Sequence, residues 1–313
     1  MLSIIIPFYN EEENLPTLIK HLIEVCEKNS KEYEIVLVDD GSTDTSVSKL
    51  KVKSDPFDKT QGHPERSRMD EKLKVLKHRK RLGKGAALLT GLNHAIGDII
   101  IFMDADLQDD PEDLAKFLKK IEAGFDFVNG VRIGRKDNLI IKTYSTLAKY
   151  FLKLFSGSPF TDINCGYKAF KREVLSQFTF YGNNFRFFPL AVFYNGYKVT
   201  EIPVRNHPRI HGKSKFGMEK IFAGIFDTLS AYFIYKFSEK PLHFFALIGG
   251  FIFTVGFMIS LYLTIERLFF GVLLYQRPIL WLGLALIIVG IQIVMTGIIG
   301  ELIVYLNKKS KET

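Results

Sequence analysis

The sequence predicts an α/β fold with a mostly parallel sheet, followed by two membrane-spanning helices. Short apolar runs alternate with segments of helical periodicity between Leu2 and Met103, which is the pattern of a doubly wound sheet. Three of these runs stop at polar clusters, as strands do at the ligand-binding edge of such a sheet. Beyond Pro241 two charge-free stretches follow, and each is long enough to cross a bilayer.

The predicted elements follow one another in a regular order. The apolar run 2–6 predicts a buried strand that stops at Pro7. After it we expect a helix over 11–28, a strand over 34–38, a helix over 42–50, a strand over 73–76, a helix over 85–95 and a strand over 99–103. Residues 49–72 are charged, contain proline and show no periodicity, so they are interpreted as a surface insertion.

The polar cluster that follows the 99–103 strand carries the clearest chemical signal. Asp104, Asp106 and Gln108 stand at alternate positions, and strand alternation would direct them to one side of the chain. Such oxygen ligands suit a hard divalent cation, Mg²⁺ or Mn²⁺, that also holds a phosphate. The alternative is a solvated turn that caps the next helix. The two acids before Pro111 fit that role, but it leaves the upstream aspartates unexplained.

Charge, motifs and cysteines exclude several functions. The chain has 42 Lys and Arg against 34 Asp and Glu, a net charge of +8, but no basic face with interleaved aromatics that would indicate nucleic-acid binding. No Gly-x-Gly-x-x-Gly follows the first strand and no Gly-Lys-Ser/Thr loop occurs, which argues against dinucleotide oxidoreductases and P-loop NTPases. Cys26 and Cys165 show no metal-ligand spacing and are interpreted as free thiols in a reducing compartment.

The two apolar stretches predict a transmembrane hairpin. Phe244–Ile265 and Ile279–Gly300 each contain 22 uncharged residues, which span about 33 Å as a helix. Lysines at 236, 240, 308, 309 and 311 flank the pair and favour a cytoplasmic location for both termini and the preceding domain. Gln292 and Glu301 are interpreted as mediators of helix contacts or of a homo-oligomer, with a position of Glu301 at the membrane interface as the alternative. Aromatic residues at helical spacing over 216–237 indicate interfacial helices or packing on the soluble domain.

Six motifs occur in order: IPFYNEE (6–12), VDDGSTD (38–44), GKGAA (83–87), MDADLQ (103–108), DINCGYK (162–168) and RIHGKSKF (209–216). Together they resemble the family 2 glycosyltransferases of the GT-A fold, and within them the polyprenyl-phosphate glycosyltransferases that use dolichyl or undecaprenyl phosphate. The resemblance implies a GT-A catalytic domain over 1–215, juxtamembrane amphipathic helices over 216–240, a two-helix hairpin over 241–307 and a basic cytoplasmic tail over 308–313.

The resemblance also implies roles for individual residues. The implied donor-binding set is Pro7, Tyr9, Glu11, Asp40, Asp104, Ala105, Asp106, Gln108, Arg209 and Lys215. Within it, Pro7, Tyr9, Glu11 and Asp40 would bind the nucleoside. Asp106 and Gln108 would hold Mg²⁺ or Mn²⁺ on the donor diphosphate, and the two basic residues suit phosphate oxygens. The implied acceptor-phosphate set is Arg132, Arg135, Lys142 and Ser145, and the implied catalytic set is Asp104, Asp106, Arg132 and Arg209.

The absence of a carboxylate base at the expected place in the sequence suggests that the acceptor is a phosphate. Family 2 enzymes that act on hydroxyl groups often carry a carboxylate base downstream of the metal motif, but residues 182–188 contain no acid. The single tryptophan, Trp281, lies in the second span, so the Gln-x-x-Arg-Trp motif of processive synthases is absent. A lipid monophosphate, with a second pKa near 6, attacks without losing a proton to the enzyme.

The resemblance therefore implies a metal-dependent hexosyltransferase that inverts the anomeric centre. The expected donor is a nucleotide sugar of the GDP-mannose or UDP-glucose type, and the expected acceptor is a dolichyl or undecaprenyl phosphate in the membrane. Two alternatives stay open: a family 2 enzyme that acts on a glycolipid hydroxyl, and a non-catalytic subunit of a glycan-assembly complex. An intact acidic cluster at 104–108 argues against the second.

Overall fold

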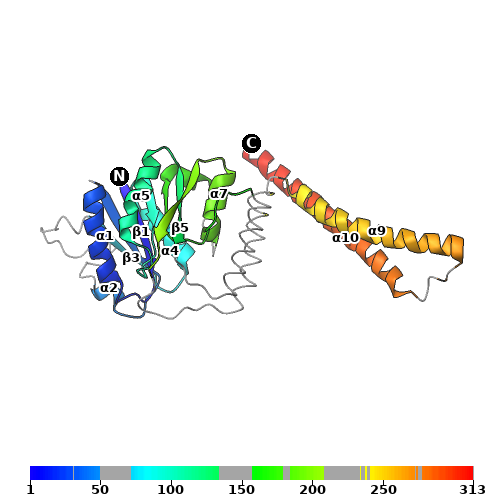
Figure 1. Ribbon diagram of the computed structural model, residues 1–313, viewed down its shortest axis with the longest axis horizontal. Helices are drawn as coiled ribbons and strands as arrows, with labels where there is room; N and C mark the ends of the chain where they lie inside the picture. Colours follow the sequence, from blue (N-terminus) through cyan, green and yellow to red (C-terminus); the bar gives the residue numbers. More distant parts are fainter. Residues whose placement is uncertain are drawn as a thin grey trace. The chain divides into compact units, whose positions relative to one another are not determined.

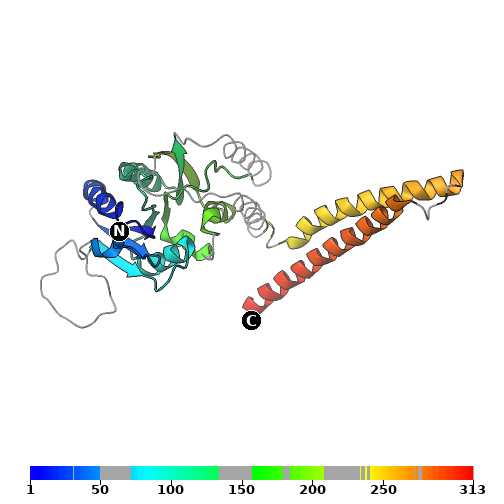
Figure 2. The ribbon, with the colours of Figure 1, turned by 90° about the horizontal axis from the view of Figure 1, so that it is seen from below.

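The computed structural model describes residues 1–30, 32–49, 72–133, 157–178, 184–207, 233, 237, 240–271, 273 and 277–312. It forms two compact units, Met1–Thr228 and Leu229–Thr313, and each is described by itself (Figures 1 and 2). The expected insertion, apart from Lys49 and Lys72, lies outside the described residues. So do the expected juxtamembrane helices, apart from Phe233, Phe237 and Lys240.

The first unit is built on a seven-stranded sheet with the order β3-β2-β1-β4-β6-β5-β7 (Figure 1). β6 is antiparallel to both of its neighbours, and the other neighbouring pairs are parallel. This confirms the predicted mostly parallel α/β class. The strands are β1 Leu2–Phe8, β2 Tyr33–Asp39, β3 Leu73–Lys77, β4 Ile99–Phe102, β5 Phe127–Ile133, β6 Lys168–Lys171 and β7 Val199–Arg205.

Helices cover both faces of this sheet. α1 (Leu15–Asn29) and α5 (Leu114–Glu122) share a buried apolar cluster with alternate residues of β1 and β2. α4 (Lys84–His94) approaches the opposite face closely, since a Cβ at Gly91 would lie 2.4 Å from the Ile5 side chain. The shorter elements are α2 (Ser46–Lys49), α7 (Phe188–Tyr194) and the 3₁₀ helices η1 (Pro111–Asp113), η2 (Arg172–Gln177) and η3 (Asn184–Phe187).

β1 passes through Pro7 instead of stopping there. The Ile5 carbonyl accepts from Met103 on the β4 side, and the Phe8 carbonyl accepts from Asp40 on the β2 side. Because successive residues of a strand alternate between its two neighbours, Pro7 faces the β4 side. The register of β4 with β1 has already ended at Ile5. A proline is tolerated here because no ladder hydrogen bond is required of its nitrogen.

Two helix starts also differ from the sequence expectation. α1 begins at Leu15 instead of residue 11, with Pro16 in its first turn, where a missing N–H costs nothing. The helix expected over 42–50 is reduced to the single turn of α2. Residues 42–45 are instead held in a loop by contacts with the segment that follows β1, described below.

The second unit is an antiparallel pair of long helices, α9 (Pro241–Phe270) and α10 (Pro278–Glu312) (Figure 2). Among the described residues these two helices are long and apolar enough to cross a membrane, over Pro241–Phe270 and Pro278–Asn307, 30 residues each. They extend beyond the 22-residue stretches that were predicted. Glu301 connects the helices, because its carboxylate accepts a hydrogen bond of 3.2 Å from the Leu242 backbone N–H, in the first turn of α9.

Glycines form the seam between α9 and α10. They recur every seven residues, at Gly249 and Gly256 on α9 and at Gly283, Gly290 and Gly297 on α10. A Cβ at Gly256 would lie 2.7 Å from the Gly283 carbonyl oxygen, and one at Gly290 would lie 2.7 Å from that of Gly249. The helices can approach this closely only because the side chains are absent. A seven-residue period keeps such a seam on one side of each helix in a left-handed supercoil.

Candidate active site

The candidate site lies where β1, β2 and β4 end. β1 pairs with β2 on one side and with β4 on the other, so the strand order reverses here. This is the position at which open α/β sheets bind ligands. The segments after β1 and β2 are joined directly: Asn10 N–H donates to Ser42 Oγ over 2.9 Å, and Thr43 N–H donates to Asn10 Oδ1 over 2.9 Å. Tyr9 and Glu11, predicted to bind the donor nucleoside, belong to this joined segment.

Asp40, the fourth residue predicted for the nucleoside, anchors the segment 78–83. Its carboxylate accepts from the backbone N–H groups of Leu82 (2.8 Å) and Gly83 (2.9 Å), and His78 Nδ1 lies 3.0 Å away. This segment carries Arg81, whose guanidinium lies over the Tyr9 ring at 4.2 Å. Asp40 is buried, and its hydrogen bonds fix this basic segment beside the Tyr9 ring.

Residues 104–109, which follow β4 and are called the aspartate loop below, do not extend the strand. β4 ends at Phe102, and Leu107 has φ +59°, a left-handed conformation that is costly for a non-glycine residue. The strand-alternation argument for Asp104, Asp106 and Gln108 was therefore wrong. The loop is closed instead by its own carboxylates.

Two hydrogen bonds within the loop hold this conformation. Gln108 N–H donates to Asp106 Oδ1, and Asp104 N–H donates to Asp109 Oδ2, each over 3.3 Å. Asp109, interpreted from the sequence as a capping residue, thus belongs to the loop itself. Asp110 does act as a cap, because it accepts from Glu112 N–H at the start of η1.

The aspartate loop concentrates negative charge. Lys84 Nζ forms an ion pair with Asp104. Burial favours a higher pKa for Asp104, but the positive charges of Lys84, Lys168 and Arg132 together hold the pKa below its ordinary value. Burial, together with the charges of Asp104 and Asp106, raises the pKa of Asp109 to about 7. The loop would therefore be stabilised by an additional cation.

The donor atoms of the loop fit a metal that the substrate completes. Within the described part of the chain, no three His, Cys, Asp or Glu side chains are grouped as metal ligands. Asp106 and Gln108 supply a carboxylate and an amide oxygen. Mg²⁺ is commonly held by one or two carboxylates together with substrate phosphates and water, so this small oxygen set is compatible with such an ion.

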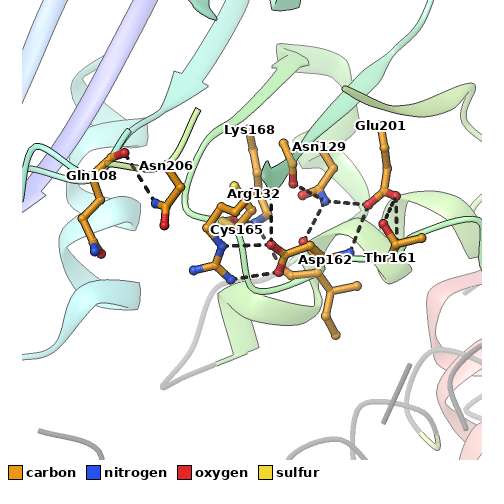
Figure 3. A network of polar contacts seen from close by, with 11 residues as sticks. Gln108, Asn129, Arg132, Thr161, Asp162, Cys165, Lys168, Glu201 and Asn206 are labelled. Atoms are coloured by element: carbon orange, nitrogen blue, oxygen red, sulfur yellow. Dashed lines mark hydrogen bonds and ion pairs between the residues drawn. The ribbon is translucent and has the colours of Figure 1, made fainter. Parts of the chain in front are cut away.

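On the other side of the site, Arg132 of β5 is fixed by Asp162 (Figure 3). Nε donates to Asp162 Oδ2 over 2.8 Å and Nη2 donates to Oδ1 over 2.9 Å. Burial favours a higher pKa for Asp162, but Arg132 outweighs it and keeps that pKa low. The turn that contains Asp162 also contacts the aspartate loop, since a Cβ at Gly166 would lie 2.5 Å from Asp104 Oδ2.

The remaining predicted residues are distributed as follows. Ala105 is buried beside the aspartates, and Pro7 lies near the end of β1. Burial raises the pKa of the Cys165 thiol to about 12, so its environment is that of a packing residue and not of a nucleophile. Five predicted residues lie outside the described residues: Arg135, Lys142, Ser145, Arg209 and Lys215.

Comparison with protein families identifies the fold and the reaction class. The family described as "Glycosyl transferase family 2" matches residues 3–179, which include β1 to β6 and both sides of the site. The chain belongs to this family. The predicted GT-A class and glycosyltransferase activity are thereby confirmed.

Two curated relatives match the chain over most of its length. A dodecaprenyl-phosphate galacturonate synthase of Rhizobium johnstonii is 30% identical, with 96% of this chain and 87% of the relative covered. An undecaprenyl-phosphate 4-deoxy-4-formamido-L-arabinose transferase of Photorhabdus laumondii is 31% identical, with 96% and 88% covered. The similarity to these two relatives therefore extends beyond the family 2 domain.

Solved structures support the fold. Glucosyl-3-phosphoglycerate synthase from Mycobacterium tuberculosis, crystallised with Mn²⁺, UDP and phosphoglyceric acid, has a TM-score of 0.54 and 17% identity. The similarity covers 74% of this chain and 78% of that chain. At this identity the match bears on the fold alone.

Three polar residues near the site were not identified from the sequence as part of it. Asn129 of β5, Lys168 of β6 and Glu201 of β7 all contact the 161–165 turn (Figure 3). Burial lowers the pKa of Lys168 to about 8. A sequence signal existed for this residue, because Lys168 is the last residue of the DINCGYK motif and the first residue of β6. For Glu201 the strand pattern held no comparable signal.

Proposed function

We propose that this protein transfers a sugar from a nucleotide diphosphate donor to a membrane polyprenyl phosphate, and that the anomeric centre is inverted. The observation that carries the proposal is the fixed guanidinium of Arg132 on the acceptor side of the aspartate loop, where its charge helps to lower the pKa of Asp104. The relatives named for dodecaprenyl and undecaprenyl phosphate, which match 96% of the chain, support the acceptor class.

Different residues of the chain would bind the two anionic substrates, the nucleotide sugar and the acceptor phosphate. Tyr9, Glu11 and the Asp40-anchored segment would enclose the nucleoside, and Asp104 would contact the nucleoside side of the donor. Asp106 and Gln108 would hold Mg²⁺ or Mn²⁺, which when bound would neutralise charge on the departing diphosphate. Arg132 would orient the acceptor phosphate for in-line attack. Alignment and electrostatic stabilisation would then supply most of the rate enhancement.

A phosphate acceptor is favoured over a hydroxyl acceptor because two nearby carboxylates are already engaged in hydrogen bonds. A phosphate monoester has its second pKa near 6 and is already an anion at neutral pH. A hydroxyl acceptor would require a carboxylate base. Two carboxylates on the acceptor side, Asp162 and Glu201, are engaged by Arg132 and by residues 161–162 respectively.

The proposal includes domain boundaries and an orientation in the membrane. Residues 1–215 would form the catalytic GT-A domain, 216–240 interfacial helices, 241–307 the membrane hairpin and 308–313 a basic tail. Both termini and the catalytic domain would face the cytoplasm, where nucleotide sugars are found. The long isoprenoid tail of the acceptor stays in the bilayer, so its phosphate is presented at the interface to a domain that the hairpin anchors there.

The test is a transfer assay with the purified full-length protein. Undecaprenyl and dolichyl phosphates are supplied with Mg²⁺ or Mn²⁺ and a panel of labelled nucleotide sugars, and the corresponding polyprenols and a membrane glycolipid serve as hydroxyl acceptors. We expect label in a lipid-linked monosaccharide only with a phosphate acceptor, and none when EDTA replaces the metal. Transfer to a hydroxyl acceptor alone would overturn the proposal, and transfer that EDTA leaves intact would overturn its metal dependence.

A further inference from the structure

A row of three polar residues crosses the sheet beneath the acceptor side of the site. Lys168 of β6 lies opposite Asn129 of β5, and Asn129 lies opposite Glu201 of β7. Residues directly opposite one another on adjacent strands point to the same face of a sheet. Asn129 and Lys168 are buried. Polar side chains in such positions are costly unless they are hydrogen-bonded.

Each member of the row holds backbone groups of the 161–165 turn (Figure 3). Glu201 accepts from Thr161 N–H at 2.8 Å, Thr161 Oγ1–H at 2.7 Å and Asp162 N–H at 3.3 Å. Asn129 Nδ2 donates to the Asp162 carbonyl over 2.9 Å. Lys168 Nζ donates to the carbonyls of Ile163, over 3.2 Å, and of Cys165. The row therefore sets the course of the turn through both its N–H and its C=O groups.

This turn connects the two sides of the site. Its Asp162 carboxylate holds the Arg132 guanidinium through two hydrogen bonds. Gly166, just beyond the turn, lies against the Asp104 carboxylate. A displacement of the turn would therefore move the guanidinium with it. In a reaction that depends on alignment, a displacement of about 1 Å can cost roughly 100-fold in rate.

We propose that the row positions Arg132 for the acceptor phosphate, and that Glu201 is its decisive member. The inference rests on the function proposed above. Glu201 accepts hydrogen bonds from the turn and from Asn129 Nδ2, at 3.0 Å, so every one of these partners is a donor. A carboxylate satisfies all of them. A glutamine of the same shape would place an NH₂ group against at least one donor and displace the start of the turn.

The experiment compares Glu201→Gln with Glu173→Gln, a matched change at an exposed glutamate whose carboxylate lies 3.8 Å from Lys171 Nζ. KM and kcat are measured for polyprenyl phosphate and for the nucleotide sugar separately. We expect Glu201→Gln to reduce kcat/KM for the lipid phosphate by about 10-fold or more, with donor KM unchanged within about twofold. Glu173→Gln should match the wild type. A general loss of structure would not distinguish the two substrates.

A double-variant cycle tests whether the effect passes through Asp162. If it does, Glu201→Gln combined with Asp162→Asn should be no worse than Asp162→Asn alone, because the two changes remove the same positioning. Thr161→Val, which deletes one hydroxyl donor at an exposed residue, should give a smaller loss in the same direction. This variant decides the question if Glu201→Gln does not fold, as judged by thermal unfolding.

The possible results distinguish failure of the positioning role from failure of the proposed function on which it rests. Independent, multiplicative effects of Glu201→Gln and Asp162→Asn would overturn the positioning role, as would equal losses for donor and acceptor. Wild-type acceptor kinetics in Glu201→Gln would overturn it as well, while the proposed function stood. Failure of the wild type and of Glu173→Gln to transfer sugar to any polyprenyl phosphate would instead overturn the proposed function, and the inference with it.

Discussion

The two sides of the candidate site differ in how their charges are balanced. On the donor side, the aspartate loop gathers Asp104, Asp106 and Asp109, with Lys84 paired to the first of them. On the acceptor side, Arg132 and Lys168 are interleaved with two carboxylates in a hydrogen-bonded network (Figure 3). The proposed donor side would be stabilised by an incoming cation, whereas on the proposed acceptor side Asp162 already holds the Arg132 guanidinium in place.

The largest effect is expected where the donor side would lose its proposed metal ligand. Asp106→Ala should reduce transfer by about 10³-fold or more, because a bound metal contributes several kcal/mol of charge stabilisation. The measurement is steady-state transfer of labelled sugar, with retention of the protein in the membrane fraction as the check on insertion. Asp98→Ala, at an exposed aspartate paired with the N-terminus, is the matched control. Unchanged turnover in Asp106→Ala would refute the metal assignment.

The acceptor side should respond to geometry as well as to charge. Arg132→Lys preserves the charge but not the two-pronged contact with Asp162, and a lysine ammonium does not reproduce that geometry. We expect kcat/KM for the lipid phosphate to fall by about 10- to 100-fold, with the donor KM little changed. An equal rise in both KM values would contradict the division of the site into two sides.

Lys84 offers a direct test of the charge excess in the aspartate loop. Lys84→Met removes the ammonium that pairs with Asp104, so a divalent cation should bind the donor-free protein about fivefold more tightly, as expected for roughly 1 kcal/mol of added attraction. Mn²⁺ binding followed by electron paramagnetic resonance measures this. Lys116→Met, which breaks a pair with Asp113, should leave Mn²⁺ affinity unchanged. Weaker Mn²⁺ binding in Lys84→Met would show that the ammonium organises the loop instead of competing with the metal.

The last effect concerns the pH dependence of stability and leaves turnover aside. The pKa of Asp109 is raised to about 7 in the folded protein, above its unfolded value of about 4. The folded state therefore binds this proton more tightly, and stability falls as the pH rises through this window. Asp109→Asn retains an acceptor for Asp104 N–H without the charge. In EDTA it should stabilise the protein at about pH 8, by on the order of 1–3 kcal/mol.

Thermal unfolding in detergent at two pH values measures this gain. It should be largest at about pH 8 and should shrink toward about pH 5, where most Asp109 carboxyls of the folded wild type are already protonated. A gain of the same size at both pH values would contradict the charge explanation. So would destabilisation by Asp109→Asn at about pH 8, since the substitution removes a negative charge from beside Asp104 and Asp106.

Much of the fold was predictable because its signals are local. The apolar runs at 2–6, 34–38, 73–76 and 99–103 became β1 to β4 within a residue or two at each end. The two charge-free stretches became α9 and α10. The glycine seam was also readable, since Gly283, Gly290 and Gly297 recur every seven residues, but it was not recognised. A periodic pattern needs no knowledge of distant contacts.

The errors and omissions fall where distant residues decide the local structure. Pro7 stays within β1 because β4 has already ended beside it. The aspartate loop closes through Asp109 and not by strand alternation. The network around Arg132 includes hydrogen bonds between residues 30 and 72 positions apart, and the sequence holds no trace of those pairings.

The sequence by itself determined the α/β class, the pair of long apolar helices and the residue types of the proposed donor side, since each depends on short-range periodicity or on a contiguous motif. The tertiary structure alone decided how those residues act together. It placed Lys84 on Asp104, gave Asp109 its raised pKa and aligned Lys168, Asn129 and Glu201 across three strands. The physical reason is that burial, hydrogen bonding and electrostatic coupling depend on distance in space, and strand order sets those distances independently of separation along the chain.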